Sequence, residues 1–381
     1  MIRQNFNADW TVEKGDGNSR MNSFLGNTQT KTVHLPYDAM IHEARTPDTK
    51  NGAQTGFYPG GEYIFQKHFT APQAWQGKPV SLVFEGVYQT ALVYLNGWLL
   101  TRNVNGYAEF TVEAGPYLKY GADNLLKVIA DNSLEPNSRW YTGSGIYRPV
   151  RLLVGNKVYL PQDTVRITTR EADEGFALLD VTAQVQSAST VTERVTLQQT
   201  ICREGTAVLT DRQNLLLQPG ESRTVSFRYC VDSPALWSPE DPNLYTSTMQ
   251  VLEGEEELDR EETRFGIRTL SIDAAHGVRI NGQTVKLRGA CIHHDNGILG
   301  AATLPDAEER RIRQLKEAGF NAIRSSHHPA GRALLDACDR YGVLVMDELS
   351  DVWNVRKNPY DYALYFEQDW KPTIQKMVAK D

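Results

Sequence analysis

The sequence predicts a multidomain fold: a β jelly-roll sandwich, an immunoglobulin-like β-sandwich, and the first three βα units of an incomplete (β/α)8 TIM barrel. Up to residue 268, short runs of alternating apolar and polar residues are separated by turn residues, which is typical of antiparallel strands. From residue 269 onward, continuous apolar runs alternate with segments of helical spacing, which indicates parallel strands and connecting helices. A chain of 381 residues is long enough for about two to four domains.

Composition and charge exclude several classes of function. Hydrophobic residues make up 40% and charged residues 23% of the chain, as in soluble globular proteins, and no apolar run is long enough to span a bilayer. The net charge of -7 argues against nucleic acid as a partner, because phosphate binding needs a basic surface. The opening residues lack the apolar core of a secretory signal, so we expect a cytoplasmic protein without a membrane partner.

The first domain, residues 1–155, is predicted to be the jelly roll. Its strand candidates are closely spaced, and turns rich in Gly, Asn and Pro separate them. Asn96-Gly97 is a strong hairpin signal, because both residues tolerate a positive φ. The strand candidates are residues 62–69, 80–87, 91–95 and 125–130.

The second domain, residues 156–268, is predicted to be an immunoglobulin-like sandwich that acts as a spacer. The acidic run from Glu253 to Glu257 is expected at a solvated hairpin tip rather than at a metal site. Cys202 and Cys230 both fall here, and a bridge between them is the less favoured alternative to free thiols. The strand candidates are residues 177–185, 191–197, 223–229 and 244–251.

The third domain, residues 269–381, is predicted to begin a parallel barrel. Asp306 is expected to cap the helix that runs to Ala318, and Gly342 to end the helix of residues 330–341. The expected order is a hairpin at residues 278–287, strands at 286–292, 321–324 and 343–346, and a last amphipathic segment at 360–380.

Ionisable side chains follow each of the three predicted parallel strands. Because the carboxyl ends of such strands open onto one face, these side chains are expected to form a site. Asp347 and Glu348 are adjacent, so only one of them can face its centre. The side chains concerned are His293, Asp295, Arg324, His327, Asp347 and Glu348.

A zinc site is the alternative for His293-His294-Asp295 together with His327-His328, because imidazole and carboxylate are zinc ligands. No HExxH or paired CxxC motif accompanies them, which disfavours the metal interpretation. His294 and His328 are instead expected to be buried structural histidines.

The stretch from Asn321 to Glu348 resembles a signature of glycoside hydrolase family 2, the family of β-galactosidases, β-glucuronidases and β-mannosidases. That signature reads Asn, any residue, apolar, Arg, two small residues, His-Tyr-Pro, and later an apolar pair, an Asp and a Gly before four apolar residues. The one departure is His328, where the family usually has Tyr. The matching residues are Asn321, Arg324, Ser325, Ser326, His327, Pro329, Leu334, Leu335, Asp339, Gly342 and 343–346.

The segments YPGGEYIFQKHF, FEGVYQTALVYLNG and SRWYTGSGIYRPV resemble the sugar-binding jelly roll that opens these enzymes, and residues 234–245 resemble their second domain. In some members, the loop at residues 137–141 reaches a neighbouring active site, which makes Arg139 and Trp140 candidate substrate contacts. Many β-galactosidases have an acid where this chain has Arg139. The alternative is that Trp140 and Tyr141 only pack between domains.

The resemblance also implies roles for the residues at the strand ends. Arg324 would pair with the catalytic nucleophile, and His327 would bind a hydroxyl of the sugar in the cleaved position. Asp295 would hold two adjacent hydroxyls, and Glu348 would support Arg324. The further candidate contacts are His293, Asp351 and Trp353.

In the family, the catalytic glutamates follow the fourth and seventh barrel strands, and an Asn-Glu dipeptide marks the acid/base. That dipeptide is absent here, and residues 269–381 supply fewer than half of the roughly 250 residues of a whole barrel. The resemblance therefore implies the amino-terminal portion of a longer enzyme, inactive alone, whose acid/base and nucleophile lie beyond Asp381.

The implied reaction is retaining hydrolysis of terminal non-reducing β-D-galactose, with carbohydrate as the partner. β-Glucuronidase and β-mannosidase are the alternatives within the family, and a non-catalytic carbohydrate-binding protein is the alternative from another class. A full-length enzyme would be a homo-oligomer, with Mg²⁺ as a possible cofactor for which no ligand is identified.

Overall fold

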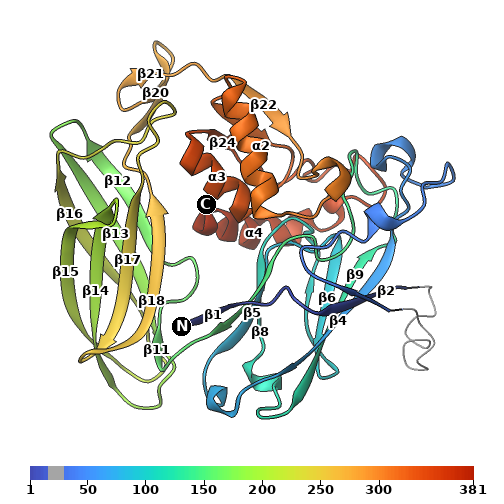
Figure 1. Ribbon diagram of the computed structural model, residues 1–381, viewed down its shortest axis with the longest axis horizontal. Coiled ribbons are helices and arrows are strands. Elements are labelled where there is room, and N and C mark those ends of the chain that lie inside the picture. The colour runs from blue at the N-terminus through green and yellow to red at the C-terminus, as the bar shows by residue number, and fades with distance from the viewer. Residues whose placement is uncertain (16–29) are drawn as a thin grey trace.

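The computed structural model describes residues 1–15 and 30–381. The jelly roll and the immunoglobulin-like sandwich lie side by side, and the α/β segment lies across their junction (Figure 1). All three regions meet there, so residues distant in the sequence come together. Within the described part of the chain, no helix is long and apolar enough to cross a membrane.

The jelly roll consists of two antiparallel sheets packed face to face. Their strand orders are β3-β2-β4-β9-β6-β7 and β1-β10-β5-β8. Period-two alternation aims Phe65, Leu82 and Val128 into the space between the sheets, where they are fully buried. The strands are β1 (Ile2–Asn5), β2 (Trp10–Lys14), β3 (Lys31–Val33), β4 (Gly61–Thr70), β5 (Val80–Phe84), β6 (Thr90–Leu95), β7 (Trp98–Asn103), β8 (Phe110–Glu113), β9 (Asp123–Asn132) and β10 (Val150–Val154).

The predicted hairpin turn is confirmed. Asn96 and Gly97 have φ angles of 52° and 89°, and they join β6 to β7. The jelly roll also contains four short 3₁₀ helices among its described residues: η1 (Met40–His42), η2 (Gly52–Thr55), η3 (Gln73–Trp75) and η4 (Gly115–Tyr117). Two more, η5 (Gly297–Leu299) and η6 (Tyr362–Leu364), lie in the α/β segment.

The second sandwich contains a sheet ordered β15-β14-β17-β18 and a sheet in which β13 pairs with β11, β12 and β16. The acidic run lies at the β17–β18 turn, as predicted, with Glu253 opposite Glu256 and Gly254 at a φ of 62°. Cys202 and Cys230 are free thiols. The strands are β11 (Val158–Tyr159), β12 (Arg166–Ala172), β13 (Phe176–Ser187), β14 (Glu193–Arg203), β15 (Thr206–Leu217), β16 (Ser222–Asp232), β17 (Tyr245–Glu253) and β18 (Glu256–Phe265).

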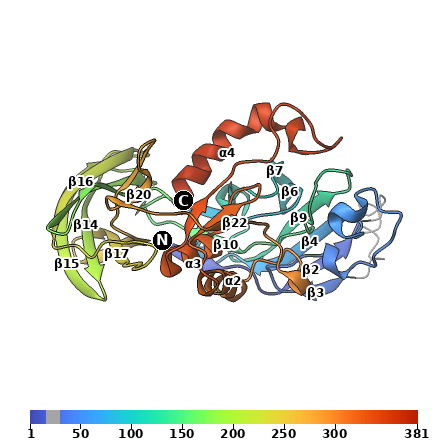
Figure 2. The same cartoon turned by 90° about the horizontal axis from the view of Figure 1, so that it is seen from above.

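The α/β segment opens with a small antiparallel sheet and continues with three parallel strands in the order β22-β23-β24. Its core consists of buried apolar side chains from these strands and from α2 and α3. Figure 2 shows α2 and α3 on one side of the strands and α4 on the other. The elements are β19 (Leu270–Asp273), β20 (Gly277–Ile280), β21 (Gln283–Thr284), β22 (Gly289–Ile292), α2 (Pro305–Glu317), β23 (Ala322–Ser325), α3 (Arg332–Tyr341), β24 (Leu344–Met346) and α4 (Phe366–Lys380).

The helix boundaries correct one prediction and confirm another. Asp306 does not cap α2, because the helix begins at Pro305 with Leu304 in the capping position. Proline favours the first helical position, and Asp306 then lies in the first turn, where its charge suits the helix dipole. Gly342 ends α3 in the left-handed conformation, as predicted.

Apolar surface is exposed on the third parallel strand and the last helix, as the open sheet predicts. Met346 on β24 is 61% exposed, and Val378 on α4 is 57% exposed. β24 is the edge strand of its sheet, so one row of its backbone groups has no partner strand among the described residues.

Candidate functional site

Glu348, just past β24, brings together Arg324 of β23 and His327, which follows that strand. Its carboxylate accepts hydrogen bonds from Arg324 Nε and, at 2.8 Å, from His327 Nδ1. The pKa of Arg324 is raised, chiefly by this hydrogen bond to Glu348. Glu348 is only 16% exposed, whereas Arg324 remains 44% exposed toward the open side. These contacts agree with the support of Arg324 that the sequence predicts for Glu348.

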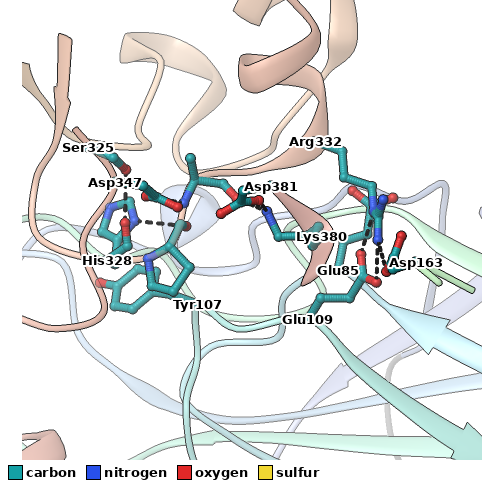
Figure 3. A network of polar contacts seen from close by, with 12 residues as sticks. Glu85, Tyr107, Glu109, Asp163, Ser325, His328, Arg332, Asp347, Lys380 and Asp381 are labelled. Atoms are coloured by element: carbon teal, nitrogen blue, oxygen red, sulfur yellow. Dashed lines mark hydrogen bonds and ion pairs between the residues drawn. The ribbon is translucent and has the colours of Figure 1, made fainter. Parts of the chain in front are cut away.

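Asp347 points the other way, as alternation along a strand requires. One of its oxygens accepts from the backbone N–H of Ala330 at 2.9 Å, and Figure 3 shows Asp347 between Ser325 and the carboxyl-terminal pair Lys380 and Asp381. Burial, and then Asp381, raise the pKa of Asp347 to about 7. Only Glu348 of the two acids therefore joins Arg324 and His327.

The jelly-roll loop reaches this group of side chains. The Trp140 ring stacks on His293 with a centroid distance of 5.2 Å and an interplanar angle of 11°, and its edge contacts His327 at 5.6 Å. Its indole N–H donates to the Tyr107 hydroxyl at 3.0 Å. The His293 ring donates from Nδ1 to the carbonyl of Ser326 at 2.6 Å. Trp140 therefore both packs between the domains and lies beside the site.

Two of the predicted substrate contacts, Arg139 and Asp351, bind each other. Arg139 donates from Nε and Nη2 to the Asp351 carboxylate at 2.6 to 3.0 Å, and Lys357 Nζ adds a third donor at 2.9 Å. Burial alone would raise the pKa of Asp351, but the hydrogen bonds from Arg139 and Lys357 lower it. This ion pair ties the jelly-roll loop to the loop that follows β24.

A small pocket lies beside His327, behind this ion pair. Its volume is about 50 Å³. Both domains line it, so a rearrangement of either loop would change its size. Its polar lining includes Tyr88, Asn137, Arg139, His327, Asp351 and Asp361.

The two remaining predicted residues lie nearer the periphery. Asp295 is half-buried, and its backbone carbonyl accepts from Arg311. Burial, Asp38 and, more weakly, the Asp295 carboxylate raise the pKa of Tyr141 in the jelly-roll loop. Trp353 is 69% exposed, and within residues 1–15 and 30–381 no ring contact joins it to the other site residues.

The four paired histidines do not gather around one point. His293 and His327 face Trp140, whereas His294 and His328 are buried against the jelly roll, as expected for structural histidines. Among the residues that the structure describes, no group of three or more His, Cys, Asp or Glu side chains is arranged to hold a metal ion.

Tyr107 is the site residue that the sequence analysis missed. It contacts Trp140, His294 and His328, yet it comes from a jelly-roll loop between β7 and β8. No local pattern marks it, because its partners lie on three other segments of the chain.

Three family models cover nearly all of the chain. Residues 10–176 match the glycosyl hydrolase 2 galactose-binding domain-like model, residues 158–268 the glycosyl hydrolases family 2 model, and residues 274–369 the family's TIM barrel domain. The chain belongs to glycoside hydrolase family 2. The predicted fold, with jelly roll, immunoglobulin-like sandwich and the start of a TIM barrel, is thereby confirmed.

Family 2 relatives align along the whole chain. It is 37% identical to a β-galactosidase, BoGH2A, of Bacteroides ovatus, over 100% of this chain and 45% of that protein. It is 31% identical to a putative β-glucuronidase of Formosa agariphila, over 100% of this chain and 36% of that protein. The chain thus spans less than half the length of either of these family 2 relatives.

Solved family 2 structures share the fold. A glycosyl hydrolase family 2 member from Bacteroides cellulosilyticus superposes with a TM-score of 0.95 at 36% identity, over 100% of this chain and 50% of that one. A β-glycosidase from Bacteroides vulgatus superposes with a TM-score of 0.91 at 30% identity, over 100% of this chain and 49% of that one.

Proposed function

We propose that this chain supplies the substrate-positioning part of a retaining β-glycosidase that hydrolyses terminal non-reducing β-D-galactose. The observation that carries the proposal is the group formed by Arg324, His327 and Glu348 at the carboxyl ends of parallel strands. Sites of parallel barrels form at that edge. The 37% identity to a β-galactosidase supports the choice of sugar.

Each positioning residue has a definite part in the proposed reaction. Glu348 orients the Arg324 guanidinium, whose charge would keep a nearby carboxylate nucleophile ionised. His327 uses Nδ1 toward Glu348, so its Nε2 is left to bind a sugar hydroxyl. Trp140 covers His293 and narrows the site from the jelly-roll side.

The carboxylates of this chain are poorly placed for the chemical step itself. Retaining hydrolysis needs two carboxyl groups about 5 to 5.5 Å apart, one as nucleophile and one as acid/base. Glu348 and Asp351 are held in ion pairs, and Asp347 faces Ala330. In our proposal the two catalytic glutamates come from sequence beyond Asp381, and the 381-residue chain alone is inactive.

The pairing of Arg139 favours a galactoside over a glucuronide. A glucuronide carries a carboxylate, which proteins bind with a cation. Arg139 lies at the rim but is already paired with Asp351. β-Glucuronidase nevertheless stays the leading alternative, because one relative is a putative β-glucuronidase. A cytoplasmic location and a homo-oligomeric whole protein also stay predictions.

The proposal is tested by fusing this chain to the remaining part of the B. ovatus β-galactosidase and assaying chromogenic glycosides. We expect turnover of β-galactoside well above that of β-glucuronide and β-mannoside. Preference for one of the other two sugars would replace the proposed substrate. A cooperatively folded fusion that binds sugars but hydrolyses none of them would favour a non-catalytic carbohydrate-binding protein.

A further inference from the structure

The two His-His dipeptides are split in the same way between the site and the domain interface. His293 and His327, the first of each pair, are half-buried beside Trp140. His294 and His328, the second of each pair, are only 6% and 2% exposed and face the jelly roll. We call His294 and His328 the docking pair.

The docking pair is enclosed by aromatic rings from the jelly roll. The Tyr107 ring stacks on His328 with a centroid distance of 4.2 Å and an interplanar angle of 13°, and Figure 3 shows the two rings one above the other. Tyr107 also meets His294 edge-on at 5.1 Å, and Tyr147 contacts His294 at 5.3 Å. The two imidazoles contact each other at 4.9 Å.

Hydrogen bonding leaves no acceptor for a second proton on either ring. His294 Nε2 lies 2.9 Å from the carbonyl of Thr142, so Nε2 carries the proton of the neutral ring. His328 Nδ1 lies 3.3 Å from the carbonyl of Pro329 and is likewise the protonated nitrogen. The other nitrogen of each ring is buried and has no hydrogen-bond partner among the described residues. A second proton would create a buried charge and an unpaired N–H.

The charged groups around the docking pair are mostly cationic. Arg148 donates to the carbonyls of Tyr107 and Pro329 at 2.7 and 2.9 Å, and Arg311 donates to the carbonyl of His293 at 2.7 Å. Glu308 is the one carboxylate lining the small cavity between these groups, and burial raises its pKa. Tyr88, Tyr107 and Tyr147 are neutral, because burial raises the pKa of each phenol.

We propose that the docking pair holds the jelly roll against β22 and β23 only while both imidazoles are neutral, and that it thereby positions His293 and His327. Each docking histidine is the chain neighbour of a site histidine. Movement of His294 therefore displaces His293, and movement of His328 displaces His327. Acid would favour an undocked state in which the imidazoles are charged, Tyr107 is separated from His328, and Trp140 is withdrawn from His293. Neither family membership nor the proposed reaction requires such acid sensitivity.

The direction of the pH effect follows from burial. Burial lowers the pKa of His294 to about 3 and that of His328 well below its usual value. A depressed imidazole pKa stabilises the docked state above the unfolded value of about 6.5 and destabilises it as the pH falls below that value. Each ring then lowers the equilibrium constant for docking about tenfold for every pH unit below 6.5. The two rings together lower it about a hundredfold per pH unit.

The experiment compares pH profiles of stability for the 381-residue chain and three variants. His294→Gln keeps an N–H donor for Thr142, His328→Phe keeps the stacked ring, and the third variant combines both changes. Below pH 6.5, these two rings should lower the docking equilibrium constant of the parent chain about a hundredfold for every pH unit. Each single variant should lose only about tenfold per pH unit, and the double variant should lose nothing from these two positions. His68→Gln, which removes an exposed histidine outside the interface, should leave the acid-side slope unchanged.

Parallel pH profiles of the parent chain and the double variant would overturn the proposal. If the variants do not fold, imidazole NMR of the unaltered chain decides. His294 and His328 must stay neutral at pH 5.5 in molecules whose domains are docked, and titration of either ring near pH 6.5 without undocking contradicts the proposal. Hydrogen exchange of the Trp140 indole reports the docking directly and should accelerate together with the acid-side loss. These readouts need no glycosidase turnover, so failure here and failure of the proposed function are distinguishable.

Discussion

At the scale of single residues, Glu348 and Asp351 each bind an arginine from another segment of the chain. The support of Arg324 by Glu348 is predictable because both residues end adjacent parallel strands. The pairing of Arg139 with Asp351 is not, since the two residues lie 212 positions apart and no motif relates them. Asp351 was predicted as a candidate substrate contact, and the structure shows it bound to Arg139 and Lys357.

Removing the Glu348 carboxylate should impair positioning rather than folding. In the fusion with the B. ovatus relative, Glu348→Ala leaves Arg324 and His327 without the group that orients them. We expect kcat to fall about 100-fold, the order of effect that small misplacements of site groups have. Steady-state kinetics on β-galactoside measure it. Glu317→Ala, which removes an exposed carboxylate on α2, should leave kcat unchanged, and an unaltered kcat in Glu348→Ala would refute the assigned role.

At the scale of elements, strands with one buried face are predictable, and an exposed strand is not. β13 alternates buried and partly exposed residues along its length, and its central part was predicted. β15 is exposed over most of its length, so no period-two apolar pattern marks it and it was not predicted. The mistaken cap of α2 has a similar origin, because Asp306 has the right chemistry but Pro305 already begins the helix.

The glycines after α2 and α3 allow the cost of backbone strain to be compared with the cost of disturbing a contact between domains. Gly342 and Gly319 both have positive φ angles, 68° and 89°. A Cβ on Gly342 would collide with the carbonyl of Pro239, whereas one on Gly319 would meet nothing within 4 Å. Gly319→Ala should cost about 1 kcal/mol of unfolding free energy, and Gly342→Ala more than about 2 kcal/mol. Urea unfolding measures both values, and equal losses would show that Pro239 does not restrain α3.

At the scale of the whole molecule, a half-buried ion cluster joins all three regions. Arg332 of α3 donates to Glu109 of the jelly roll at 2.7 and 2.8 Å and to Asp163 near the second sandwich at 2.5 Å. Figure 3 shows Glu85 beside the same guanidinium. Burial alone would lower the pKa of Arg332, but these carboxylates raise it. No sequence pattern predicts the cluster, because its members come from separate domains.

Breaking this cluster should loosen the α/β segment from both sandwiches. Arg332→Leu leaves Glu109 and Asp163 without their half-buried counter-charge, and we expect a loss of about 2 kcal/mol in unfolding free energy. The control is Arg340→Leu on the same helix, whose ion pair with Glu309 is largely exposed and should contribute less than about 1 kcal/mol. Denaturant unfolding measures both variants. Similar losses would mean that the cluster does not couple the domains.

The central claim is that this chain positions substrate but does not carry the catalytic carboxylates. The most direct measurement is hydrolysis of chromogenic β-galactoside, β-glucuronide and β-mannoside by the 381-residue chain alone. We predict no turnover of any of the three. Turnover that disappears in Asp295→Ala, Asp347→Ala or Glu348→Ala would contradict the claim, because the carboxylates of this chain would then perform the reaction.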